Sequence, residues 1–193
     1  MIEMASANQM SKRSERLTRE VWLSRALEHL AQDGKAKLTV DKLVRALGVT
    51  KGSFYWHFRD RDDFQQSLVK YWDHQYTQSV IKLVTPLKGS PDDRLWAIME
   101  TVCKEDLARY DVAIRAWAAQ EPAVVDLVRS VDNSRLRLVR SLFAELGFRG
   151  TELQMRTRSF VTYVSLELGI TVRQSKRQRL DCLRHFHAMI TAK

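Results

Sequence analysis

Apolar residues along this chain of 193 residues are spaced as in helical proteins. From residue 17 onward they recur at intervals of three and four, which places them on one face of a helix. No stretch alternates between apolar and polar residues for long enough to make a strand. The pattern predicts an all-α fold without internal repeats or low-complexity segments.

Capping residues and helix breakers divide this pattern into separate helices. Thr, Ser or Asp precedes most of the expected starts, and glycine or proline follows several of the ends. Two capping boxes, Thr151–Gln154 and Ser175–Gln178, mark the last two starts. The expected helices span residues 19–33, 40–47, 51–57, 61–85, 91–110, 111–120, 122–146, 151–172 and 175–192. The helix at residues 61–85 is long enough to connect two domains.

Residues 38–58 contain two short helices separated by a very tight turn. Thr39 is an N-cap in front of the apolar run at residues 40–47, and Gly48 follows where a C-cap needs positive φ. Thr50 then offers a second N-cap within three residues of the break. Two helices so closely joined must cross, which predicts a helix-turn-helix.

The second of these helices is expected to bury Phe54 and Phe58 and to expose an unusual set of side chains. Hydrogen-bond donors, a planar aromatic ring and a glycine that allows close approach are what a major-groove reader needs. An alternative is that some of these side chains only complete a small core. The predicted DNA-binding residues are Thr39, Lys51, Gly52, Ser53, Tyr55, Trp56, His57 and Arg61.

These residues divide into roles by their chemistry. Lys51 and Ser53 in the first turn can donate to base edges, and Trp56 offers an apolar plane to a thymine methyl or a deoxyribose. Tyr55 and His57 carry donors suited to phosphates, as do Thr39 and Arg61 at the flanking helix starts.

At these positions the sequence resembles the TetR-type bacterial transcriptional regulators, most closely over residues 27–64. The shared pattern is a helix ending in Gly34, a Thr39-capped helix, Gly48-Val49 at the turn, and Tyr55-Trp56-His57-Phe58. The resemblance implies a DNA-binding regulator with a helical C-terminal ligand domain. Asp41 departs from the pattern, because the family often presents arginine to a phosphate there. A carboxylate cannot make that contact, so we assign Asp41 no DNA role.

Composition and charge agree with this interpretation. The formal net charge is +9, and residues 1–61 hold 12 Lys and Arg against 7 Asp and Glu, so positive charge is densest near the helix-turn-helix. Residues 1–16 are expected to be a disordered basic arm, residues 17–61 the DNA-binding domain, and residues 62–193 the effector-binding and dimerisation domain. Without a signal-peptide pattern or an apolar run of ~20 residues, we expect a cytoplasmic protein, located at the nucleoid when bound to DNA.

Motifs for catalysis, metal binding or a cofactor are not found in the sequence. Cys103 and Cys182 lack metal-ligand spacing, and no phosphate-binding loop, nucleophile elbow or paired-carboxylate motif occurs. We therefore expect no enzymatic activity, no metal and no cofactor. Cys103 lies in the apolar phase of its helix and is expected to pack as a small core residue.

The C-terminal domain is where a small organic effector is expected to bind. Its helices carry aromatic and soft side chains of the kind that line ligand pockets, although aromatic residues at helical spacing more often form core. Glu167 interrupts an apolar run and is expected to face solvent or to pair with a cationic effector or with Arg158. The predicted pocket residues are Trp96, Met99, Cys103, Tyr110, Trp117, Phe143, Tyr163 and Glu167.

The last two helices each carry an apolar stripe that predicts a homodimer. Two such helices from each of two chains would form a four-helix bundle, and a twofold pair of recognition helices contacts more base pairs. The alternative is that the stripes pack within their own domain. The predicted interface residues are Leu153, Phe160, Val161, Val164, Leu168, Leu180, Leu183, His187 and Ile190.

Together these features predict a homodimeric repressor that a small effector releases from a palindromic operator. One rival hypothesis is a helical small-molecule-binding protein or enzyme with a vestigial helix-turn-helix. A second is a DNA-binding regulator controlled by a protein partner. The sequence does not identify the effector, the operator or the regulated genes.

Overall fold

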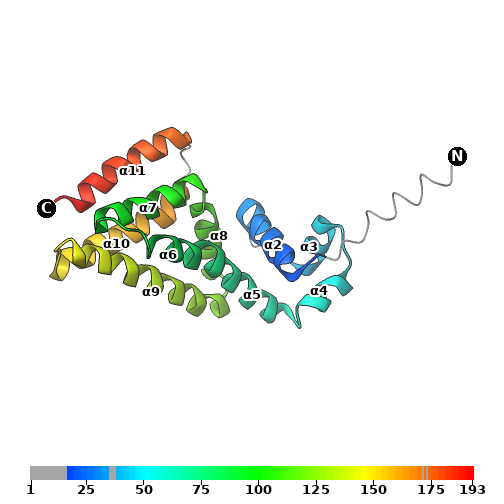
Figure 1. The fold of residues 1–193 in the computed structure, drawn as a ribbon. Coiled ribbons are helices and arrows are strands. Elements are labelled where there is room, and N and C mark those ends of the chain that lie inside the picture. Colours follow the sequence, from blue (N-terminus) through cyan, green and yellow to red (C-terminus); the bar gives the residue numbers. More distant parts are fainter. Residues whose placement is uncertain (1–16, 35–37, 171, 173) are drawn as a thin grey trace.

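The computed structural model describes residues 17–34, 38–170, 172 and 174–193, so the predicted basic arm at residues 1–16 lies outside it. The described residues are helical and contain no strand, which confirms the predicted all-α fold. The helices are α2 (Arg19–Asp33), α3 (Val40–Leu47), α4 (Lys51–His57), α5 (Arg61–Asp73), α6 (Ser79–Val84), α7 (Pro91–Lys104), α8 (Ala108–Ala118), α9 (Pro122–Glu145), α10 (Gly150–Leu166) and α11 (Lys176–Thr191) (Figure 1).

Helices α2, α3 and α4 lie at one end of the molecule and begin where their capping residues predict. The hydroxyls of Thr18, Thr39 and Thr50 each accept a hydrogen bond from the backbone amide three residues on. Gly48 ends α3 in the left-handed conformation with φ 66° and ψ 30°, which costs glycine little. The helix-turn-helix is therefore present as predicted.

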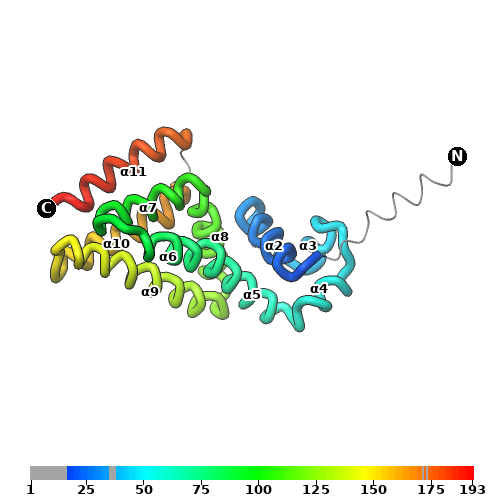
Figure 2. The backbone as a smooth tube through the Cα atoms, viewed as in Figure 1, coloured from blue at the N-terminus to red at the C-terminus, as the bar shows by residue number. Residues whose placement is uncertain are grey.

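A nearly straight helical segment connects this end to the other helices (Figure 2). It begins with α5, capped by Asp60, and continues through a π-helical turn (His74–Gln78) into α6, which ends at Val84. The sequence predicts one helix here but not the π-helical turn. Such turns widen a helix locally and are frequent at functional sites.

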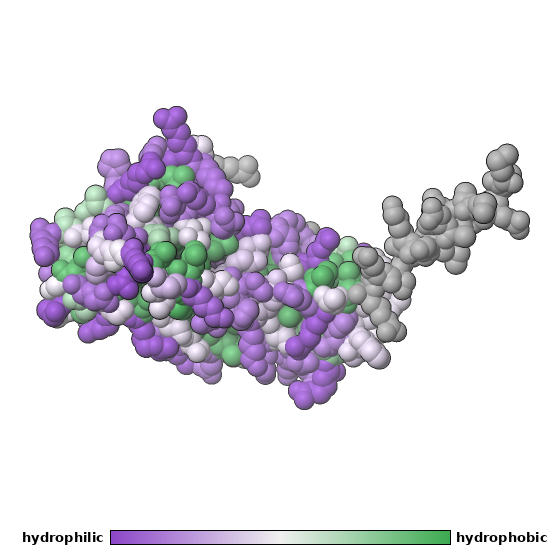
Figure 3. All heavy atoms as spheres, viewed as in Figure 1, coloured by the Kyte–Doolittle hydropathy of each residue, from purple (hydrophilic) through white to green (hydrophobic). Residues whose placement is uncertain are grey.

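The apolar core has two parts that meet along this connector. One part joins α2, α4 and α5 to α8 and α9, and includes the fully buried Trp22, Trp72 and Trp117. The other lies among α6, α7, α9, α10 and α11, around Phe143 and Phe160. On the face that Figure 3 shows, hydrophilic residues cover most of the surface between smaller apolar areas. No helix among the described residues is long and apolar enough to cross a membrane.

Two predicted helix boundaries are wrong, and both corrections involve Arg179 of α11. Helix α7 ends at Lys104 rather than near Tyr110, because Asp106 adopts a left-handed φ of 54° before α8 begins. Helix α10 ends at Leu166 rather than Val172, and a 3-10 turn (Glu167–Gly169) follows it. Arg179 donates to Asp106 Oδ1 at 2.7 Å and to Glu167 Oε1 at 3.1 Å. One side chain thus binds the residues that follow both helix ends.

The predicted capping box at Thr151–Gln154 is also wrong, because α10 begins one residue earlier, at Gly150, and has no side-chain cap. The box at Ser175–Gln178 is confirmed, with both of its hydrogen bonds formed.

The apolar stripes of α10 and α11 pack largely inside the protomer. Leu153, Phe160, Val164, Leu183 and Ile190 are buried in the core beside α7 and α9. The remaining predicted residues, Val161, Leu168, Leu180 and His187, are partly buried in the protomer. The five buried residues have little apolar area left to offer a second chain, and the predicted interface itself stays a prediction.

Candidate nucleic-acid interface and internal cavity

Helix α4, the predicted recognition helix, exposes most of the side chains that the sequence predicts. Phe54 and Phe58 are fully buried and pack edge-on against the Trp22 ring at 5.8 and 6.3 Å between centroids. Their burial fixes the rotation of α4, so that Tyr55 and Trp56 remain 59% and 73% exposed. These two adjacent aromatic side chains form an exposed apolar surface on α4.

Lys51 does not stand alone at the start of α4. Its Nζ lies 2.6 Å from Asp41 Oδ1 of α3, and both side chains are more than half exposed. The hydrogen bond between them raises the pKa of Lys51 and lowers that of Asp41. The sequence assigned Asp41 no DNA contact, but did not reveal that this carboxylate neutralises a predicted base-contacting residue.

The other predicted DNA-binding residues surround α4. A Cβ added at Gly52 would meet only Thr50 Oγ1, at an ordinary 3.6 Å, so internal packing does not require glycine there. Ser53 and His57 are partly buried. Thr39 caps α3, and Arg61 lies 3.4 Å from Glu121 at the start of α9.

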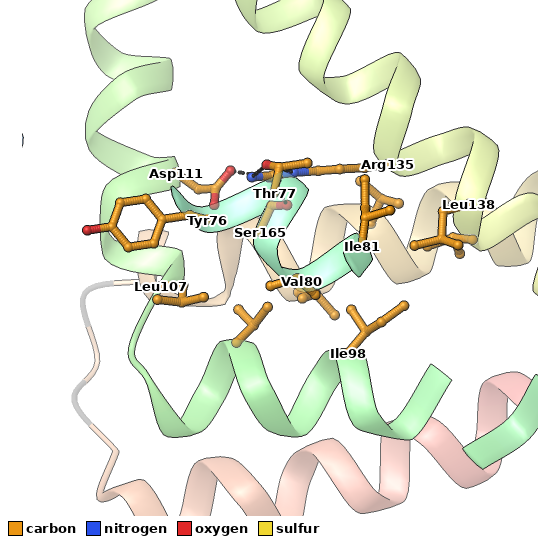
Figure 4. A pocket seen from close by; sticks show the side chains of 14 residues that line it. Tyr76, Thr77, Val80, Ile81, Ile98, Leu107, Asp111, Arg135, Leu138 and Ser165 are labelled. Carbon is orange, nitrogen blue, oxygen red and sulfur yellow. Dashed lines mark hydrogen bonds and ion pairs between the residues drawn. The ribbon is translucent and has the colours of Figure 1, made fainter. Parts of the chain in front are cut away.

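An internal cavity lies beside the far end of the connector, between α6, α7, α9 and α10 (Figure 4). Its volume is about 50 Å³, enough for a few water-sized atoms. Most of its wall is aliphatic. The lining residues are Tyr76, Thr77, Val80, Ile81, Ile98, Val102, Leu107, Asp111, Arg135, Leu138, Val139, Val161, Val164 and Ser165.

One wall of the cavity is polar and is organised by Arg135 of α9. Figure 4 shows its guanidinium between Thr77, Asp111 and Ser165, which come from three other elements. Arg135 is ion-paired with Asp111, donates to Thr77 Oγ1 at 2.6 and 3.0 Å, and donates to Ser165 Oγ at 3.2 Å. It also lies over the Trp72 ring, 5.0 Å from the centroid. Arg135 thus joins the connector to α8 and α10.

Asp111 is a buried carboxylate with two arginine neighbours. Only 4% of its side chain is exposed, and burial raises its pKa, while Arg135 and Arg115 act in the opposite direction. Arg115 in turn pairs with Asp132, with 2.9 Å between Nη1 and Oδ2. Buried charges persist in proteins when they are paired in this way.

A second contact network joins α8 to the DNA-binding end. Tyr110, next to Asp111, donates to Glu28 Oε2 of α2 at 2.8 Å, and Arg109 donates to the same oxygen at 3.0 Å. The Tyr110 ring stacks on Tyr76 with 4.6 Å between centroids. Because Tyr76 lines the cavity, these contacts form a short path from the cavity to α2.

Comparison with known proteins identifies the helix-turn-helix. Residues 23–68 match the model of the family described as bacterial regulatory proteins, tetR family. The helix-turn-helix of this chain is thus similar to that of the tetR family. A curated relative, the transcriptional regulator AcuR of Cereibacter sphaeroides, is 31% identical over 84 residues, which are 44% of this chain and 38% of AcuR. The matched region thus spans less than half of this relative.

Solved structures extend the likeness to the whole fold. The TetR-family regulator PfmR of Thermus thermophilus has a TM-score of 0.71 at 15% identity, covering 88% of this chain and 96% of PfmR. The structure of AibR in complex with isovaleryl coenzyme A and operator DNA also has a TM-score of 0.71 at 15% identity. That match covers 89% of this chain and 97% of AibR.

The predicted pocket residues are not gathered around the cavity, and none of the eight lines it. Met99, Cys103 and Phe143 are core residues around α7 and α9, and Tyr110 and Trp117 belong to the core shared with α2. The burial of Cys103 confirms its expected role as a core residue.

The other three predicted pocket residues lie near α11. The Trp96 ring lies 5.6 Å from His187, and Tyr163 stacks on Phe186 at 4.2 Å. Glu167 pairs with Arg179 rather than with Arg158. Among the described residues, no group of three His, Cys, Asp or Glu side chains could hold a metal ion.

The polar wall of the cavity was missed, although the sequence contains a signal for it. Arg135 occupies the apolar phase of its helix, four residues after Val131 and four before Val139. Asp111 similarly interrupts the apolar phase between Ala108 and Ile114. A charged residue in a buried phase requires a partner, so two such residues on neighbouring helices predict an internal ion pair.

Proposed function

We propose that this chain is a homodimeric transcriptional repressor that binds an operator through α3 and α4 and is released by a small-molecule effector. One observation carries the proposal. Only three residues separate α4 from the connector, and the far end of the connector supplies four residues of the cavity wall, Tyr76, Thr77, Val80 and Ile81. A ligand that moves this wall necessarily acts on the helix that positions α4.

The size of the cavity supports a response to occupancy. An apolar cavity of ~150 Å³ binds benzene, and the volume present here is about a third of that. An effector of more than a few atoms would therefore displace part of the wall. The connector changes its helical hydrogen-bond pattern at the π-helical turn, which lies in this wall.

The homodimer is proposed to form through the outward faces of α10 and α11. Met155 and Met189 are 58% and 66% exposed, and flexible methionine side chains suit packing surfaces. Arg156 of α10 bonds the carbonyl of Ile190, so the two methionines lie on segments that are held together. The bound DNA and acyl coenzyme A named for AibR support the same general scheme for this fold.

The decisive experiment measures binding to DNA from beside the gene that encodes this chain. Fluorescence anisotropy should show sequence-selective binding whose affinity falls steeply with salt, because phosphate contacts release counterions. An effector should weaken operator binding by the same factor by which operator weakens effector binding, typically 5–150-fold. Binding equal to that of shuffled DNA would contradict the DNA-binding part of the proposal. An effector that binds the chain but leaves operator affinity unchanged would contradict the allosteric part.

The oligomeric state has its own test. Met155→Arg combined with Met189→Arg should convert the dimer to a folded monomer, because the charges would be desolvated at the interface. Light scattering gives the mass, and circular dichroism checks the fold. A variant that stays dimeric would place the interface elsewhere. Leu183→Arg is unsuitable, since Leu183 is buried within the protomer.

A further inference from the structure

We infer that the cavity is built for an uncharged ligand, a small aliphatic molecule with one oxygen atom that accepts hydrogen bonds. This inference rests on the proposed function in that it takes the cavity to be the effector site. It adds the chemical class of the effector and the residues that select it.

The shape of the ligand follows from the division of the cavity wall. Nine lining residues are Val, Ile or Leu, and the four polar residues lie together on one side (Figure 4). An aliphatic part of the ligand that packs against the Val, Ile and Leu side chains gives up no hydrogen bonds on leaving water. A polar group in the same place would lose its hydrogen bonds to water. The ligand therefore has a single polar end.

The polar end is best matched by an acceptor. The hydroxyls of Thr77 and Ser165 are buried, and each accepts from Arg135. Neither hydroxyl hydrogen is used in a hydrogen bond between the described residues, so each can donate to an incoming oxygen. Alcohol, ketone and ester oxygens meet this requirement.

The charge of the ligand follows from the ion pairs behind this wall. Asp111 pairs with Arg135, and Arg115 lies 3.9 Å from Asp111 while pairing with Asp132. Two carboxylates and two guanidinium groups thus compensate one another. A carboxylate ligand would compete with Asp111 for Arg135, and an amine would compete with Arg135 for Asp111. A ligand of either charge leaves one buried charge without a partner. An uncharged ligand leaves both ion pairs intact.

The experiment compares three probes with the same number of non-hydrogen atoms, 1-butanol, butylamine and propanoate, on the full chain without DNA. Isoleucine methyl NMR in a slightly alkaline buffer reports the site directly, because Ile81 and Ile98 line the cavity and Ile114 and Ile190 are buried elsewhere. We expect 1-butanol to shift the first two methyl signals and to bind at least about tenfold more tightly than either charged probe.

A substitution at Asp111 should reduce the preference for 1-butanol over propanoate. Asp111→Asn leaves Arg135 without its carboxylate, so propanoate should bind at least about tenfold more tightly than it binds the unmodified chain. Asp126→Asn on the exposed face of α9 is the matched control and should change nothing. If Asp111→Asn does not fold, the comparison of the three probes decides alone.

Three outcomes would overturn the inference. Propanoate or butylamine binding as tightly as 1-butanol would contradict the charge argument and leave the proposed effector site intact. Propanoate binding folded Asp111→Asn no more tightly than the unmodified chain would show that this ion pair does not select the ligand. If no probe moves the Ile81 and Ile98 signals, the cavity is not a ligand site, and that part of the proposed function fails as well.

Discussion

The two ends of this molecule use the same interaction, an aspartate paired with a basic residue, in opposite surroundings. At the DNA-binding end, Asp41 and Lys51 are 57% and 63% exposed. In the cavity wall, Asp111 and Arg135 are 4% and 14% exposed. Water screens the first pair, which can open cheaply when DNA arrives. Opening the second pair leaves two buried charges, and each then needs a new partner of opposite charge. The buried pair therefore resists opening and discriminates between ligands by their charge.

Breaking the buried pair should have the largest effect. Arg135→Met leaves Asp111 buried beside Arg115 alone and should lower the free energy of unfolding by about 3 kcal/mol or more. Denaturant unfolding measures this change. Arg129→Met on the same helix is the control, because Arg129 is 66% exposed. Adding Asp111→Asn should restore part of the loss, and a cost indistinguishable from that of the control would show that the pair is not buried as described.

The exposed recognition helix should behave in the opposite way, with function lost and stability kept. Lys51→Ala combined with Trp56→Ala should reduce specific operator affinity at least about tenfold, since each good base contact contributes about 1–3 kcal/mol. The melting temperature should stay nearly the same, because both side chains are exposed. Lys82→Ala on α6 is the control for charge, and retained specific affinity would mean that α4 is not the recognition helix.

The path between the two ends should affect coupling rather than binding. Tyr110→Phe keeps the ring stacked on Tyr76 but removes the hydrogen bond to Glu28, so α8 is held less firmly to α2. We expect the coupling between effector and operator to fall by about 0.5–2 kcal/mol. Titrations of each ligand with and without the other measure it, with Tyr163→Phe as the control. Unchanged coupling would remove this path from the mechanism.

The smallest effect is expected at the exposed pair itself. Asp41→Asn frees Lys51 to contact phosphate or base, so operator affinity should rise and the salt dependence should steepen by about one counterion. Thermal stability should not change, and Asp181→Asn on α11 should alter neither quantity. A fall in specific affinity would instead show that Asp41 accepts a hydrogen bond from a base.

Local chemistry explains which structural features the sequence could predict. Thr18, Thr39, Gly48, Thr50 and Ser175 act within one helical turn of their own position, and all of these caps form as expected. The rotation of α4 was equally predictable, because Phe54 and Phe58 must turn inward wherever the helix packs.

Features that depend on distant residues were predicted poorly. Nothing near Asp106 in the sequence indicates a helix end, whereas Gly169 gave a local signal beside Glu167 that the predicted helix passed over. Arg179 of α11 pairs with both Asp106 and Glu167. The apolar stripes of α10 and α11 could be recognised, but the sequence could not show that α7 and α9 already cover them.

The sequence by itself thus determined the helical fold and the capped helix-turn-helix, since these follow from interactions over a few residues. The tertiary structure decided where the cavity lies and what it can hold. Thr77, Asp111, Arg135 and Ser165 are far apart in the chain and acquire joint chemistry only when four elements bring them together. Burial strengthens the interactions between these groups and raises the cost of leaving any of them unpaired. Burial is a property of the folded molecule rather than of any single residue.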